Sequence, residues 1–265
     1  MLCSRCHHFE AAPDGVLCTA CATPAGFAAP PGAAPPGSGM PGAGTPKVWL
    51  RSPVGLGWAT VALLGLAAAV DLFAVVADYL RYDVTGDLAA GDSGAAVLDR
   101  ADTSDVLTGL AAGAQLVVLL ACAVVFVIWL WRVRVNAEVF APDGHRQARG
   151  WVIAGWIVPF VSLWYPRRIV LDVWDASSVG DRPRGHALVN VWWTLWLLTN
   201  VVGRFLANLA GEAETSQEIH DTTRQLLFAD ALDLAAALVA AVMVLRLTRM
   251  QDEKARRGPT APAAV

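Results

Sequence analysis

The chain has 265 residues, of which 55% are hydrophobic and only 16% are charged, and its formal net charge is −3. Its mean hydropathy is +0.47. This composition lies on the membrane side of ordinary globular proteins and argues against a typical soluble enzyme. It also provides no excess of positive charge for binding nucleic acid.

Residues 1–23 hold four of the five cysteines, in two closely spaced pairs: Cys3, Cys6, Cys18 and Cys21. Each CxxC pair can aim two thiolates at one ion, which is the pattern of a zinc ribbon. Two disulfides are the alternative, but a cytosolic location disfavours them. Because protein thiolates fill all four positions, we expect structural Zn and expect His7 and His8 to lie outside the ligand set.

Residues 24–46 carry seven prolines and six glycines without periodicity. Such a segment cannot bury a hydrophobic core, so it predicts a disordered linker between the zinc module and the rest of the chain.

Five apolar stretches follow, at residues 54–76, 107–131, 151–174, 187–209 and 226–247. A helix that spans a membrane needs roughly 20 apolar residues, and four of the stretches meet this requirement. The third is interrupted by Pro159 and Pro166 and carries Arg167 and Arg168. We therefore predict an all-α membrane domain over residues 47–250, with four transmembrane helices and a Pro-broken cytoplasmic segment that is interfacial or re-entrant.

The distribution of basic residues favours four spans over five. With four spans and a cytoplasmic N-terminus, sixteen of the twenty basic residues lie on the cytoplasmic side, as the positive-inside rule requires. A fifth span would move residues 251–265, predicted to be a disordered basic tail, to the outside. All eleven tryptophans fall in the cytoplasmic half, where aromatic rings collect at headgroup depth. We predict a multi-pass protein of the cell (inner) membrane with both termini in the cytoplasm.

Charged side chains inside predicted spans form a candidate intramembrane polar cluster of Asp71, Asp78, Arg204, Asp230 and Asp233. Most of them lie at a similar depth in the outer leaflet, so we expect an acidic cluster clamped by the single arginine. Buried charges are costly and are either paired or functional. Two interpretations remain open: an ion-pair lock between helices, and a pathway for a cation or proton.

Three motifs carry a resemblance to a known family: Trp131-Arg132-Val133-Arg134-Val135-Asn136-Ala137, Gly155-Trp156-Ile157-Val158-Pro159 and Leu163-Trp164-Tyr165-Pro166. Over roughly residues 50–250 the chain resembles the bacterial membrane-protein family called domain of unknown function 4328. The resemblance implies four membrane helices, often preceded by a zinc ribbon and a Pro/Gly-rich linker, and it implies no activity. Ser162 departs from the asparagine that the family favours before its Leu-Trp step.

These motifs also define a candidate site for a lipid headgroup or a partner: Arg132, Arg134, Asn136, Trp156, Pro159, Pro166, Arg167 and Arg168. Its arginines could donate to an anionic group at the inner leaflet. The alternative is an element that only packs the helices and anchors them at the membrane surface.

The sequence contains no catalytic Ser-His-Asp set and no glycine-rich phosphate loop, so we expect no enzyme. The leading interpretation is a non-enzymatic membrane adaptor or sensor, whose zinc module binds a cytosolic protein partner while the helices contact membrane lipids. The alternative is a small-ion or proton carrier that uses the acidic cluster.

Overall fold

The computed structural model of the chain describes residues 50–178 and 185–257. This part of the chain contains no strand, and its elements are α1 (Val54–Ala89), α2 (Ala95–Phe140), α3 (Trp151–Ile157), the 3-10 turn η1 (Val161–Leu163), α4 (Tyr165–Ser177), α5 (Ala187–Glu212) and α6 (Ser216–Arg257). The predicted all-α class is therefore confirmed. The predicted zinc module and linker lie outside the described residues.

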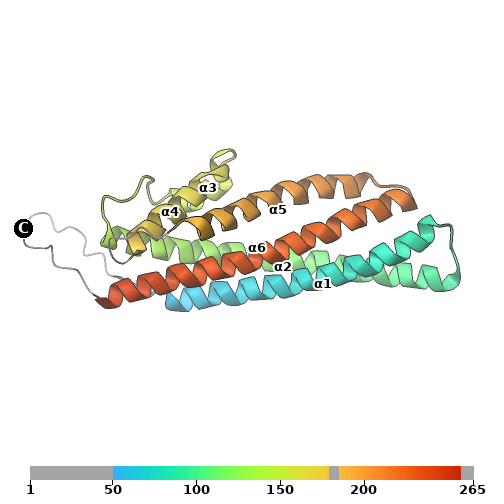
Figure 1. The fold of residues 1–265 in the computed structure, drawn as a ribbon, viewed down its shortest axis with the longest axis horizontal. Coiled ribbons are helices and arrows are strands. Elements are labelled where there is room, and N and C mark those ends of the chain that lie inside the picture. Colours follow the sequence, from blue (N-terminus) through green and yellow to red (C-terminus); the bar gives the residue numbers. More distant parts are fainter. Residues whose placement is uncertain (1–49, 179–184, 258–265) are drawn as a thin grey trace, which may run out of the picture. The chain divides into compact units, whose positions relative to one another are not determined.

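The four long helices run alongside one another (Figure 1). Helix α1 packs against both α2 and α6, and α6 also packs against α5. The short helices α3 and α4 pack against each other and against α2. Helix α5 thus joins the bundle mainly through α6 and α4, and this leaves space between α5 and the α1–α2 pair.

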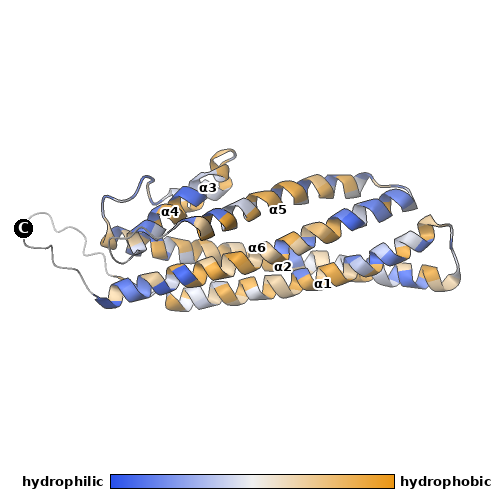
Figure 2. Ribbon diagram, in the orientation of Figure 1, coloured by the Kyte–Doolittle hydropathy of each residue, from blue (hydrophilic) through white to orange (hydrophobic). Residues whose placement is uncertain are grey.

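Helices α1, α2 and α6 are long and apolar enough to cross a membrane. They contain 36, 46 and 42 residues, which correspond to about 54, 69 and 63 Å at 1.5 Å per residue. A bilayer's hydrocarbon core is only about 30 Å thick. Each helix therefore extends beyond its apolar segment into polar turns, as the blue ends of α6 show in Figure 2.

Helix α5 is not among the candidate spans of the described residues, so the predicted number of four spans stays a prediction. The helix has 26 residues, and Asn190, Asn200 and Arg204 interrupt its apolar sequence. Three tryptophans, whose hydropathy is close to that of polar residues, lower its mean further.

Residues 77–106, which lie between the first two apolar stretches and are rich in aspartate, are mostly helical. Only residues 90–94 connect α1 to α2. Arg100 of α2 pairs with Asp83 of α1 at 3.1 Å and also with Asp87. These contacts join the ends of the two helices, although exposed ion pairs of this kind contribute little stability.

The helix of the Pro-broken segment is interrupted between Ile157 and Tyr165, next to Pro159 and Pro166. Helix α3 ends at Ile157, just before Pro159, and Pro166 lies in the first turn of α4, where its missing N–H costs nothing. Between them Phe160 has a φ of 62°, a conformation that L-residues rarely adopt. Ile157 and Phe160 are 74% and 76% exposed, so the turn presents an apolar tip.

The chain is still helical at residue 251, where the disordered tail was predicted to begin. Helix α6 continues through residue 251 and ends at Arg257. Gln251 is only 1% exposed, and the Lys254 ammonium donates to the carbonyls of Ala176 and Ser178, at 2.7 and 3.1 Å. Contacts with α4 and α2 hold these residues in the helix, which a polar sequence does not reveal.

The main hydrophobic core lies at the end of the bundle that carries α3 and α4. It contains Trp129, Trp174, Trp192, Trp193 and Met243, each at most 4% exposed. Helices α2 to α6 all contribute buried residues to this core, and α1 contacts it through partly buried side chains such as Leu56 and Leu64. The rest of the bundle is packed less completely, and a cavity opens there.

Candidate functional site

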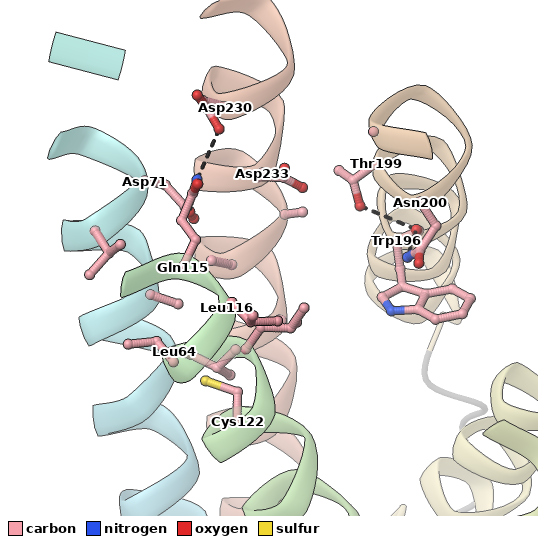
Figure 3. A pocket seen from close by; sticks show the side chains of 18 of the residues that line it. Leu64, Asp71, Gln115, Leu116, Cys122, Trp196, Thr199, Asn200, Asp230 and Asp233 are labelled. Carbon is pink, nitrogen blue, oxygen red and sulfur yellow. Dashed lines mark hydrogen bonds between the residues drawn. The ribbon is translucent and has the colours of Figure 1, made fainter. Parts of the chain in front are cut away.

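A cavity of about 470 Å³ lies between α1, α2, α5 and α6. Each of the four helices contributes polar and apolar side chains to its lining (Figure 3). Four members of the predicted intramembrane cluster line it: Asp71, Arg204, Asp230 and Asp233. Residues up to 162 positions apart in the sequence are therefore brought around one space by the packing of the helices.

Gln115 of α2 links two of these carboxylates. Its Nε2 donates to Asp71 Oδ1 at 3.2 Å and to Asp230 Oδ1 at 2.9 Å. Asp71 is only 8% exposed. A single amide nitrogen thus holds carboxylates from α1 and α6 at the wall of the cavity, and its two N–H groups cannot balance their charge.

Gln115 was not among the predicted site residues. It stands in the apolar stretch 107–131, whose other side chains are almost all aliphatic or aromatic. An amide inside a predicted span is a polar residue that needs a partner, and this is the signal in the sequence that points to it.

The predicted clamp by Arg204 is absent. Although Arg204 lines the cavity, it makes no ion pair with any carboxylate in residues 50–178 and 185–257. Arg204 is exposed, and α5, on which it lies, does not pack against α1 or α2. Asp78 is buried, at 4% exposed, and lies about two helical turns beyond Asp71, the last residue of α1 that lines the cavity. The carboxylates of the cluster therefore have no arginine partner within the described part.

Aromatic side chains lie where the cavity adjoins the main core. Trp192 and Trp196 of α5 line the cavity. Phe126 of α2 lies 6.0 Å from Trp192, and Trp156 of α3 lies 5.4 Å from Trp196, measured between ring centroids. The predicted site residue Trp156 does not line the cavity; its ring packs against Phe126 of α2 and Trp196 of α5.

Asn136 joins the beginning of α1 to the end of α2. Its Nδ2 donates to the Arg51 carbonyl at 2.8 Å and to Gln251 Oε1 at 3.2 Å, and its Oδ1 accepts from the Arg51 amide at 3.1 Å. The residue is 2% exposed. Its hydrogen bonds are satisfied by the protein, so its contacts are those of a structural residue.

The predicted arginines have separate surroundings. Arg134 is 3% exposed, pairs with Glu138 and donates to the Gln147 carbonyl at 2.8 Å. Arg167 donates twice to Asn190 Oδ1, at 3.1 and 2.7 Å. Arg132 donates to the Ser52 carbonyl at 3.3 Å. Three of the four arginines of the candidate headgroup site thus bind protein oxygens, and Arg168 has no such contact in the described residues.

His145, in the loop between α2 and α3, has both ring nitrogens buried without a hydrogen-bond partner in the described part of the chain. Its burial, and then the positive charge of Arg134, lower the pKa of its imidazole below the ordinary 6.5. The nearby backbone of Ala137 and the charges of Glu138 and Asp172 offset only part of this shift. Protonation is thus easier in the unfolded chain than in the folded protein.

We expect the thermal stability of the purified protein to fall as the pH drops below about 6.5, because His145 binds a proton more readily when unfolded. The His145→Gln variant cannot titrate at this position and should lose less stability on acidification. The measurement is the melting temperature in detergent at pH 7.5 and pH 5.5. An equal loss in both proteins would contradict this assignment.

The predicted zinc ligands Cys3, Cys6, Cys18 and Cys21 lie outside the described residues. Within residues 50–178 and 185–257, no group of three or more His, Cys, Asp or Glu side chains is arranged to hold a metal ion. The carboxylates of the cavity are among these side chains. They line one space without converging on a single point.

The apolar helices around a polar cavity are consistent with a multi-pass membrane protein. A family model described as "Domain of unknown function (DUF4328)" matches residues 92–249, which is more than half of the chain. The chain belongs to this family, as its three motifs predicted. No curated protein and no solved structure matches it.

Proposed function

We propose that α5 is a fourth membrane span, so that the domain crosses the cell membrane four times with both termini in the cytoplasm. Its 26 residues correspond to about 39 Å of helix, enough to cross the hydrocarbon core. It packs along α6, which is a candidate span. An even number of spans leaves most arginines on one side, as the positive-inside rule requires.

We propose that the domain is a small-ion or proton carrier whose binding groups are the carboxylates of the cavity. The observation that carries this proposal is the joint hydrogen bonding of Asp71 and Asp230 to Gln115, beside a third carboxylate, Asp233. Three carboxylates and one guanidinium, that of Arg204, line the cavity, and none of them forms an ion pair within the described residues.

Uncompensated charge inside a membrane protein is costly, so these carboxylates require protons or a bound cation. An ion-pair lock, the other interpretation of the cluster, would need Arg204 to pair with an aspartate. The structure has an open cavity next to the carboxylates, where such an ion pair would have to form. A group that must exchange its neutralising partner in an accessible space is suited to carrying a cation or proton.

The test is proton flux in liposomes that contain the purified full-length protein and a trapped pH-sensitive dye. We expect Asp230→Asn to reduce the flux about tenfold or more, because an amide of the same shape cannot bind a proton at this position. Asp102→Asn is the matched control, since Asp102 is exposed near the start of α2. Equal flux in wild type and Asp230→Asn would reject the carrier.

The adaptor or sensor remains a second candidate, supported by the spacing of Cys3, Cys6, Cys18 and Cys21. It differs from the carrier in which part of the chain it needs. If the protein is an adaptor, replacing Cys3 and Cys6 with serine should abolish capture of a cytosolic partner from native membranes. If it is a carrier, deletion of residues 1–46 should leave proton flux intact.

A further inference from the structure

The cavity is much larger than a proton or a small inorganic ion requires. Its volume of about 470 Å³ falls within the range of about 300–1,000 Å³ that is typical of sites for small organic molecules. A bare ion would leave most of this space to water. The volume therefore fits a charged ligand that also carries bulky organic substituents.

The two sides of the cavity differ in chemistry. Asp71 and Asp230, held by Gln115, stand on α1 and α6, and Asp233 joins them from α6 (Figure 3). Helix α5 contributes the indole ring of Trp196, which lies across the space from them in Figure 3, and Trp192 also lines the cavity. Carboxylates attract a positive centre, and among the aromatic rings tryptophan offers the best face for a cation.

Aliphatic side chains complete the lining, among them Leu64, Leu116 and Leu119. They offer apolar surface to the substituents of a ligand, whose burial is favourable in proportion to area. An inorganic cation gains nothing from such surface. A lipophilic cation gains from the carboxylates, the aromatic rings and the aliphatic walls together.

Other classes of ligand fit less well. A metal ion needs several ligands around one point, and the described residues offer no group of three or more acidic, histidine or cysteine side chains so arranged. An anion would meet Asp71, Asp230 and Asp233 and only one arginine, Arg204. An uncharged acyl chain would leave the carboxylates without a counter-charge.

We propose that this cavity binds a monovalent lipophilic organic cation, one whose positive centre sits at the carboxylates of Asp71, Asp230 and Asp233 and whose substituents contact Trp196 and Trp192. This inference rests on the proposed cation site and specifies the ligand class that the site takes. Since a proton and the organic cation neutralise the same carboxylates, they compete, and binding should weaken in acid.

The test is equilibrium binding of radiolabelled tetraphenylphosphonium to the purified full-length protein in detergent. We expect one saturable site. Asp230→Asn should weaken binding about tenfold or more, as is usual when a charge partner is removed from a desolvated site. Trp196→Ala should weaken it several-fold, as expected for loss of a cation–π contact.

Two controls match these variants. Asp102→Asn changes an exposed aspartate, and Trp58→Ala removes a tryptophan that is 57% exposed on α1; neither should alter binding. Trp196→Phe keeps an aromatic face and should retain most of the affinity. If Asp230→Asn does not elute as a monodisperse protein, Asp233→Asn tests the same wall at a carboxylate to which Gln115 does not donate.

Absence of saturable binding by the wild type would overturn the inference, and so would binding that Asp230→Asn and Trp196→Ala leave unchanged. The two proposals fail separately. Proton flux that depends on Asp230, without tetraphenylphosphonium binding, would leave the carrier and reject the organic cation. Loss of both would reject the cation site itself.

Discussion

Replacing Gln251 with alanine is expected to destabilise the folded protein by about 3 kcal/mol or more, since buried polar groups that lose their partners cost about 1–3 kcal/mol each. The Gln251 side chain donates to the Val133 carbonyl at 2.7 Å and to Ser177 Oγ at 3.1 Å, and it accepts from Asn136 at 3.2 Å. The residue is 1% exposed. One side chain of α6 thus joins α2 and α4.

The measurement is the unfolding midpoint of the purified protein in mixed micelles of increasing denaturing-detergent content. Gln217→Ala is the matched control, because Gln217 lies on the same helix but is exposed and has only a 3.4 Å contact with Asp221. The control should unfold at the same detergent content as the wild type. A midpoint for Gln251→Ala that equals that of the control would show that the network contributes nothing.

The second large effect is expected at Gly57, where α1 approaches α6 closely. A Cβ atom at this position would lie 2.5 Å from Thr248 Oγ1 and 2.8 Å from its Cγ2. Thr248 cannot rotate freely, because its Oγ1 accepts a hydrogen bond of 3.0 Å from the Trp129 indole nitrogen. Gly57→Ala should therefore cost about 1–3 kcal/mol through overpacking and lower the melting temperature.

Gly65→Ala on the same helix is the control, since nothing lies within 4 Å of the Cβ that it adds. It should stabilise α1 by about 0.5–1 kcal/mol, because alanine favours helix over glycine. A double-mutant cycle adds a sharper measurement: in a Thr248→Ala background, which removes the two closest atoms, Gly57→Ala should cost less. Equal costs in both backgrounds would exclude the steric explanation.

The helices and their apolar segments followed from the sequence because burial in lipid demands long apolar stretches, whatever packs beside them. The break at Pro159 and Pro166 followed for a similarly local reason, since proline cannot continue a helix interior. The ends of the helices did not follow. Residues 251–257 read as a polar tail, and only the buried contact of Gln251 with α2 and α4 explains why they stay helical.

The candidate site was predicted in part. Charges within apolar stretches identified Asp71, Asp230 and Asp233 as residues of interest, and the structure places all three around one cavity. Equal depth along the helices predicts an ion pair with Arg204, yet depth along a helix says nothing about the direction in which a side chain points. The bridging amide of Gln115 was missed because its partners lie 44 and 115 positions away in the sequence.

By itself, the sequence determined the helical class, the family, the location of the apolar segments and the identity of the carboxylates within those segments. These properties depend on composition and on neighbours along the chain. Only the tertiary structure decided that Gln115 joins two of those carboxylates, that Arg204 stands apart from them, and that α5 leaves a cavity beside them. Such contacts depend on how helices rotate and pack against one another, and no local pattern specifies that.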